Sequence, residues 1–225
     1  MGAPILEKHG RHEERKDERR AAIVDIAHAA FLADGYAATS MSTIAARVGG
    51  SKATLYNYFS SKEELFAAVV SRKCGQIETL LYDAQVEGGD FRPAKQNFGE
   101  RFIALVLQED SVATYRMVMA ESARFPELGR TFYDTGMKQG RARLAEYFEQ
   151  AIADGVLRQC DSALMANYFF DLCMSGIHIR KLWNVQPVLS SENIRDNVAR
   201  AIAIFLAAFG TDAGYREEAV RLCAP

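Results

Sequence analysis

Apolar side chains recur every three or four residues over the first third of the chain, which is the period of a helix with one buried face. One such stripe covers residues 18–34, and a second covers 41–48 before Gly49-Gly50 interrupts it. A brief helix over 51–59 and a longer one from Ser61 towards Tyr82 follow, and neither contains a proline. The pattern predicts four consecutive helices.

The same spacing continues to the end of the chain. Helix-breaking residues, notably Phe125-Pro126 and Gly155, divide it into further segments. The predicted helices cover residues 93–106, 111–124, 127–154, 161–183 and 191–209. No segment alternates as a half-buried strand would, so we expect an all-α protein.

Charge is unevenly distributed along these helices. Residues 1–75 carry 11 Lys+Arg against 9 Asp+Glu, whereas residues 76–225 carry 16 against 20, and the whole chain has a net charge of -2. A small basic module ahead of a larger acidic body suits a nucleic-acid reader joined to a second domain. A charge difference of this size is equally typical of solvated helix faces.

Several classes of protein are disfavoured by composition. The longest apolar run, residues 201–209, is too short to span a membrane, and the charged start does not resemble a secretory signal. The four cysteines lie far apart without C-x-x-C spacing, so we expect neither a zinc site nor a disulfide framework. This use of cysteine is typical of a protein in a reducing cytoplasm. No cofactor motif or common catalytic motif is present, so an enzyme is the weaker hypothesis.

A helix, a glycine turn and a short second helix are the parts of a helix-turn-helix, whose second helix enters the DNA major groove. The second helix here offers polar groups that can reach phosphates and base edges: Ser51, Lys52, Thr54, Tyr56, Asn57 and Tyr58. Ser40, Ser42 and Lys62 stand near helix N-termini, where anions are favoured. Spacing alone fits an amphipathic three-helix packing unit equally well.

The joined motifs of residues 35–40, 44–45, 49–59 and 61–65 resemble the DNA-binding domain of the tetracycline-repressor (TetR) family. This resemblance covers about residues 19–70. It implies an all-helical homodimer that binds a palindromic operator on double-stranded DNA. It also places Lys52, Ala53, Tyr56 and Asn57 at base or backbone contacts, and Thr39, Ser51, Thr54, Tyr58 and Lys62 at phosphate-facing positions.

Three positions depart from the family pattern. Gly50 stands where a small apolar residue such as valine is usual, so we expect a less tightly packed turn. Tyr58 stands where histidine is common, although its hydroxyl can still donate to a phosphate. Ala53, in place of glycine or proline, can add a methyl contact to thymine.

The body resembles regulatory domains of multidrug-efflux-type members through residues 120–128 and Phe132-Tyr133. The resemblance implies a small, apolar or amphipathic effector that releases the DNA. The candidate effector-binding residues are Phe102, Tyr115, Arg116, Met117, Glu121, Phe132, Tyr133, Met137, Phe169 and Cys173. Such aromatic and methionine stripes are equally typical of an ordinary core. His178 and Cys173 lie on different helical faces and do not make a metal site.

Residues 202–209 are apolar on every side, which favours a last helix buried between subunits of a dimer, with an ordinary central helix of a monomer as the alternative. We therefore predict a cytoplasmic, ligand-responsive regulator, most simply a repressor. Its expected parts are an arm over 1–18, either helical or disordered, a helix-turn-helix domain over 19–65, and a ligand-binding and dimerisation domain over 66–225. A DNA-binding regulator without a ligand, or an all-helical enzyme, are the alternatives.

Overall fold

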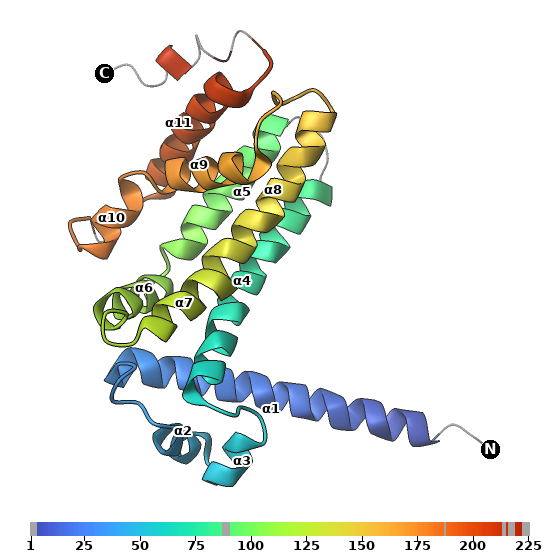
Figure 1. Cartoon of the computed structure of the whole chain (residues 1–225), viewed down its shortest axis with the longest axis vertical. Helices are drawn as coiled ribbons and strands as arrows, with labels where there is room; N and C mark the ends of the chain where they lie inside the picture. The colour runs from blue at the N-terminus through green and yellow to red at the C-terminus, as the bar shows by residue number, and fades with distance from the viewer. Residues whose placement is uncertain (1–3, 87–90, 187, 213–214, 216–218, 222–225) are drawn as a thin grey trace. The chain divides into compact units, whose positions relative to one another are not determined.

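The structure is a computed structural model that describes residues 4–86, 91–186, 188–212, 215 and 219–221. Helices are the only regular elements in this described part of the chain, as Figure 1 shows. Extended pairing there is limited to one isolated bridge between Leu157 and Gly210. The all-α prediction is therefore confirmed.

The helices form two compact units. The first combines residues 1–72 with 117–132, and the second combines 73–116 with 133–225. Two helices belong to both units: α4, Lys62–Val86, and α6, Glu109–Glu121. The end of α6 and the helix after it therefore fold with the N-terminal helices, although they lie far along the chain.

The first unit contains α1 (Pro4–Asp34), α2 (Met41–Val48), α3 (Lys52–Tyr56), the start of α4, the end of α6, and α7 (Pro126–Phe132). Its core is built on the rings of Phe31, Tyr36 and Phe66, whose centroids lie 5.5 to 5.9 Å apart. Tyr36 lies two residues after the end of α1, so the ring that closes the core comes from a connecting segment rather than from a helix stripe.

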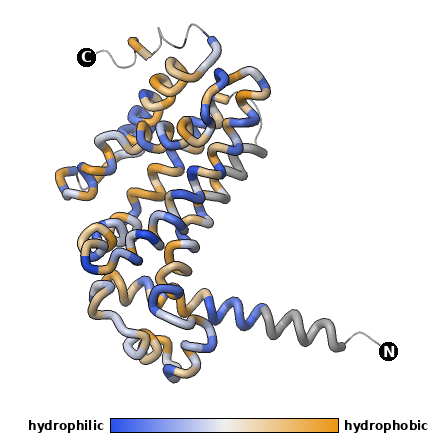
Figure 2. The backbone as a smooth tube through the Cα atoms, viewed as in Figure 1, coloured by the Kyte–Doolittle hydropathy of each residue, from blue (hydrophilic) through white to orange (hydrophobic). Residues whose placement is uncertain are grey.

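Helix α1 begins at Pro4, well before the predicted start near residue 18. Residues 14–20 form an exposed, hydrophilic stretch of this helix (Figure 2). Its arginine and glutamate side chains are good helix formers, which explains how a helix persists without a buried face. Arg19 donates to the Val48 carbonyl at 3.2 Å, and the Arg20 guanidinium lies 4.8 Å from the Phe59 ring centre. This part of α1 therefore anchors the end of α2 and the segment after α3.

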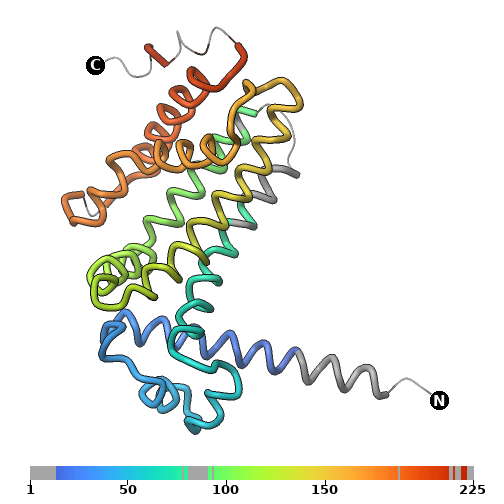
Figure 3. Tube along the Cα trace, viewed as in Figure 1, coloured from blue at the N-terminus to red at the C-terminus, as the bar shows by residue number. Residues whose placement is uncertain are grey.

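The second unit contains the remainder of α4 and α6 with α5 (Phe91–Val106), a π-helical turn (Tyr133–Met137), α8 (Lys138–Ala153), α9 (Ser162–Met174), α10 (Ile177–Leu182) and α11 (Ser191–Phe209). Helix α9 packs on α8 and α11, and α11 also packs on α5, as the traces in Figure 3 show. A Cβ on Gly99 would lie 2.6 Å from Val198 Cγ1, so only glycine permits this approach of α5 and α11.

Two predicted helices are divided in the structure. The segment predicted over 161–183 breaks at Ser175-Gly176, where Gly176 has a φ of 71°, and yields α9 and α10. The segment predicted over 127–154 is α7, the π-helical turn and α8 in succession. Neither break involves proline, and we did not predict a helix end at Gly176.

No helix within the described residues is long and apolar enough to cross a membrane.

Candidate functional site

The α2–turn–α3 segment is held in shape by serine caps. Ser40 accepts a hydrogen bond from the Thr43 N–H at 3.1 Å, and Ser51 accepts one from the Thr54 N–H at 3.0 Å. Each cap satisfies a backbone donor that the helix start leaves unpaired. Gly49, with a φ of 71°, ends α2 and turns the chain towards α3. The sequence thus encodes the helix-turn-helix through its caps as well as its apolar stripe.

Leu55 and Phe59 hold α3 on the core, since both side chains are buried. The remaining face of α3 and its flanks is exposed: Ser51, Lys52, Ala53, Thr54, Tyr56 and Asn57. Ser40 and Ser42 at the start of α2 are also exposed, and Tyr58 is half-buried. Most of the residues expected to contact DNA therefore lie on the surface of the first unit, with hydroxyl, amide and ammonium groups facing outward.

Thr39 is placed differently from the expectation. Its side chain is buried, and its hydroxyl donates to the carbonyls of Gly35, at 2.7 Å, and Ala30, at 3.3 Å. The hydroxyl satisfies the C-terminal end of α1, where carbonyls lack helical partners. The Thr39 hydroxyl is therefore engaged with main-chain carbonyls of the first unit.

Lys62, also expected at a phosphate, is half-buried. Its ammonium donates to the Tyr36 carbonyl at 2.8 Å and lies 4.1 Å from the centre of the Tyr36 ring. Burial lowers the pKa of Lys62, while the carboxylate of Glu63 opposes that shift. The Tyr36 hydroxyl in turn donates to Glu63 at 3.3 Å, and burial beside this carboxylate raises the pKa of Tyr36. An ammonium has three donors, so two remain for a ligand.

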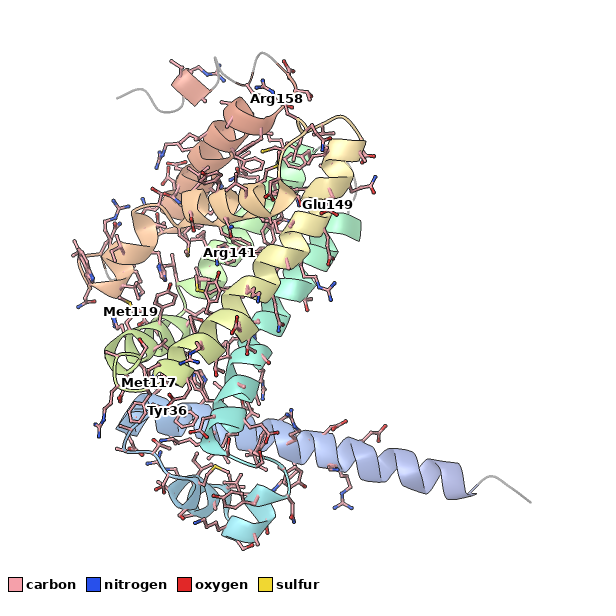
Figure 4. The ribbon with its side chains drawn as sticks, in the orientation of Figure 1. Tyr36, Met117, Met119, Arg141, Glu149 and Arg158 are labelled. Carbon is pink, nitrogen blue, oxygen red and sulfur yellow. The ribbon has the colours of Figure 1, made fainter. Side chains whose placement is uncertain are left out.

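The α6–α7 corner, residues 117–132, contacts Tyr36 and Ala37. The Ala37 N–H donates to Glu121 Oε1 at 3.4 Å, and the Phe125 ring lies edge-on to Tyr36 with centroids 5.6 Å apart. Figure 4 labels Tyr36 and, on α6, Met117. Sequence reasoning missed this role of Tyr36 because Phe125 lies 89 positions further along the chain, and no local periodicity marks such a contact.

Comparison with known proteins decides the family. Residues 23–69 match the model of bacterial regulatory proteins of the tetR family, and residues 96–211 match the C-terminal domain of AefR-like transcriptional repressors. The chain belongs to the TetR family of transcriptional regulators. This family consists of DNA-binding regulators rather than enzymes, and the resemblance to the TetR family is confirmed.

Individual TetR-family relatives support the assignment. The transcriptional activator FasR of Mycolicibacterium smegmatis is 47% identical over 144 residues, which cover 57% of this chain and 66% of FasR. The flavonoid-responsive regulator FrrA is 31% identical, with a TM-score of 0.72 over 88% of this chain and all of FrrA. A crystal structure assigned to the family, from Mesorhizobium loti MAFF303099, is 27% identical, with a TM-score of 0.77 over 88% of this chain and 99% of that one. The chain therefore spans slightly less than two thirds of FasR.

The candidate effector-binding residues of this TetR-family chain fall into two groups. Met117, Glu121 and Phe132 belong to the first unit, whereas the others belong to the second: Phe102, Tyr115, Arg116, Tyr133, Met137, Phe169 and Cys173. Glu121 faces the Gly35–Ala37 segment, where its carboxylate accepts a main-chain hydrogen bond. The ten candidate residues are thus divided between the two units.

Within the second unit, Phe102, Phe169 and Cys173 are part of the buried core. The Phe102 and Phe170 ring centroids are 4.7 Å apart, and burial raises the pKa of the Cys173 thiol to about 12. Tyr133 is exposed and Met137 is half-buried. No group of three or more His, Cys, Asp or Glu side chains suited to a metal ion occurs in the described part of the chain.

Arg116 has a structural partner. Its guanidinium donates to the carbonyls of Leu182, at 2.8 Å, and Lys181, at 2.9 Å, and so caps the end of α10. Lys181 forms an ion pair with Glu109 at the other end of α6. Tyr115 lies edge-on to His178, with centroids 4.8 Å apart. These contacts join α6 to α10 inside the second unit, and sequence spacing gave no sign of them.

Proposed function

We propose that this TetR-family regulator is a homodimeric repressor that binds a palindromic operator and leaves it when a small amphipathic effector binds the body. One observation carries the DNA-binding part: a capped α3 with a continuous exposed polar face, at the position where the family reads the major groove. We propose base or backbone contacts for Lys52, Ala53, Tyr56 and Asn57. Ser40, Ser42, Ser51, Thr54, Tyr58 and Lys62 are the proposed phosphate-facing residues.

The operator claim is tested by selecting bound sites from random DNA with the purified protein at stated salt. We expect a palindrome with half-sites about one helical turn, roughly 34 Å, apart. Lys52→Ala and Tyr56→Ala should weaken binding to that site, whereas Lys138→Ala, on an exposed part of α8, is the matched control. No enriched palindrome at low or moderate salt would contradict operator binding.

Dimerisation is supported by large apolar side chains that lie exposed on two helices in contact, Leu164 and Tyr168 on α9 and Ile204 on α11. Their exposed fractions are 41%, 48% and 41%. Large apolar side chains grouped on neighbouring helices are typical of a subunit interface. Two such helices from each subunit would form a four-helix contact.

The dimer is tested with Ile204→Glu by sedimentation or light scattering. A charge in the centre of the interface should shift the protein towards monomer, because it would be buried without a partner. Met119→Glu replaces an exposed apolar residue of α6, outside these two helices, and should leave the dimer intact. A monomeric wild-type protein, or a dimeric Ile204→Glu variant, would count against this interface.

Effector response is supported by the way the chain connects its units. Helices α4 and α6 each belong to both units, and the α6–α7 corner contacts Tyr36 and Ala37 beside the helix-turn-helix. An effector that binds one arrangement of these helices better would shift the population away from the DNA-binding one. A coupling of about 1 to 3 kcal/mol is sufficient for regulation.

Repression is favoured by the match to the AefR-like repressor domain, while FasR, the relative at 47% identity, is described as an activator. Transcription in vitro from a promoter carrying the selected operator separates the two. We expect less transcript when the protein is added and recovery with an effector; an increase would support activation. Action on bacterial DNA implies a cytoplasmic protein.

A further inference from the structure

The second unit contains a buried lysine without a polar partner. Lys95, in α5, is 0% exposed, and its ammonium has no hydrogen-bond acceptor among the described residues. The other buried lysine of this unit, Lys181, is paired with Glu109. A buried charge is normally paired, because removing it from water is unfavourable. Lys95 is therefore an exception that needs an explanation.

Aromatic rings surround the Lys95 ammonium. It lies 3.3 Å from the centre of the Tyr147 ring, 5.7 Å from that of Phe98 and 5.9 Å from that of Phe91. Ring faces attract a cation, but they do not accept the three hydrogen bonds that an ammonium can donate. This aromatic cage, formed by Tyr147, Phe98 and Phe91, stabilises the ammonium but does not replace a negatively charged partner.

The cage has an inner and an outer side. Phe98 and the neighbouring Phe148 are fully buried, whereas Phe91 and Tyr147 are half-buried and so reach the surface of the unit. Phe91 also packs on Tyr147 and Phe148, with centroids about 6 Å apart. A molecule that displaced the Tyr147 or Phe91 ring would meet the ammonium first and buried aromatic rings behind it.

We propose that Lys95 is the counter-ion for the effector, and that this effector is an amphipathic monoanion. Its carboxylate or phenolate accepts hydrogen bonds from Lys95 Nζ after the Tyr147 ring moves aside, and its apolar part packs on Phe98 and Phe148. The inference rests on the proposed effector response, whose site it places at the α5–α8 contact.

The charge of the site favours this class of ligand. A monoanion neutralises a single buried ammonium, whereas a neutral molecule leaves it unpaired and a dianion introduces a second unpaired charge. In contrast to Lys95, the Arg141 guanidinium elsewhere on α8 is already paired with a carboxylate, that of Asp171, at 3.2 Å. Burial also lowers the pKa of Lys95 to about 7, so proton uptake can accompany the arrival of an acid.

The test measures direct binding to the full-length protein without DNA, by calorimetry at pH 7. The probes are dodecanoate and dodecan-1-ol, 3-phenylpropionate and 3-phenylpropan-1-ol, and the flavonoid naringenin as the phenolic acid. We expect the wild-type protein to bind at least one carboxylic acid about tenfold or more tighter than the matched alcohol. Alternatively, we expect it to bind naringenin with an affinity that is lost when Lys95 is replaced. The carboxylate and phenol arms distinguish the two sources of the anion.

Lys95→Met removes the amine while keeping a flexible chain of similar size. It should abolish the preference for the acid, and the preference should survive in the surface control Lys138→Met. Equal affinity of the wild type for acid and alcohol, a preference that persists in Lys95→Met, or no binding of any probe would overturn the proposal.

Two further measurements keep the test decisive. Lys95→Met should raise the melting temperature of the unliganded protein, because an unpaired buried amine is removed; a lower value would indicate a structural lysine and count against the proposal. If the variant does not fold, NMR of reductively methylated wild-type protein replaces it. The lysine with the lowest pKa should then titrate higher with dodecanoate than with dodecan-1-ol, and an unchanged pKa would refute the proposal.

The outcome is separable from that of the proposed function. Lys95-dependent binding of an acid with no effect on operator affinity would support this site and contradict effector-controlled release. If an acid releases the operator but binds Lys95→Met as tightly as the wild type, the result would support effector-controlled release and contradict this site.

Discussion

The Lys62 ammonium donates to the main-chain carbonyl of Tyr36 at 2.8 Å, and Tyr36 is the residue whose ring contacts Phe125 of the α6–α7 corner. A residue proposed to face a phosphate is thereby joined to the segment that folds onto the DNA-binding helices from far along the chain. The hydrogen bond uses one of three donors, so the same side chain can serve the fold and the DNA.

For Lys62→Met we expect weaker binding to every operator sequence tested. The slope of log K against the logarithm of salt concentration should also become shallower by about 1 for each half-site. The reason is that a phosphate contact releases a counterion whatever the base. Fluorescence anisotropy over a salt series measures the slope. An unchanged slope with lowered melting temperature would mean that Lys62 serves only the fold.

The serine caps permit a matched comparison. Ser51→Ala removes the cap of α3 and should lower the free energy of unfolding by about 1 kcal/mol, because the Thr54 N–H loses its acceptor. Ser42→Ala changes an exposed serine inside the first turn of α2 that does not cap a helix, and should change stability by less than about 0.5 kcal/mol. Denaturant unfolding measures both variants. Equal losses would contradict the assignment of Ser51 as the cap.

The two turn glycines should respond in opposite directions. Gly49→Ala forces an L residue into a left-handed conformation and should destabilise the protein by about 1 to 2 kcal/mol. Gly50→Ala places a Cβ 3.8 Å from that of Thr54, an ordinary contact, and should stabilise it by about 0.4 to 1 kcal/mol by restricting the unfolded chain. Thermal unfolding of the pair gives the signs, and a stabilising Gly49→Ala would contradict the turn geometry.

The Gly50 result also bears on the sequence prediction. We expected a loosely packed turn because valine is usual there, whereas a Cβ on Gly50 would make ordinary van der Waals contacts, 3.8 to 3.9 Å from atoms of Thr54 and Arg19. The helix-turn-helix was readable because its signals are local: an apolar stripe, a glycine and a capping serine all act within a few residues.

The contacts that sequence analysis missed are long-range. Tyr36 with Phe125, Arg19 with the Val48 carbonyl, and Arg116 with the end of α10 join residues 29 to 89 positions apart. No periodicity encodes such pairs. The buried position of Lys95 was missed for a related reason: a lysine four residues into a helix suggests a solvated face, and only the packing of α5 against α8 encloses it.

Lys95 should leave a signature in the pH dependence of stability. Its pKa is about 7 in the folded protein and near 10.5 when unfolded, so between these values the unfolded chain holds the extra proton. Stability must therefore rise with pH from about 7, by at most about 1.4 kcal/mol per pH unit.

The rings of Tyr147, Phe91 and Phe98 face the amine, and the raised pKa of Tyr147 affects stability only above pH 10. The Cys173 thiol, raised to about 12 from 9, opposes the trend near pH 9. Denaturant unfolding of wild type and Lys95→Met between pH 6.5 and 8.5 measures the difference, which should narrow as pH rises. Parallel curves would mean that Lys95 keeps an ordinary pKa and reaches water.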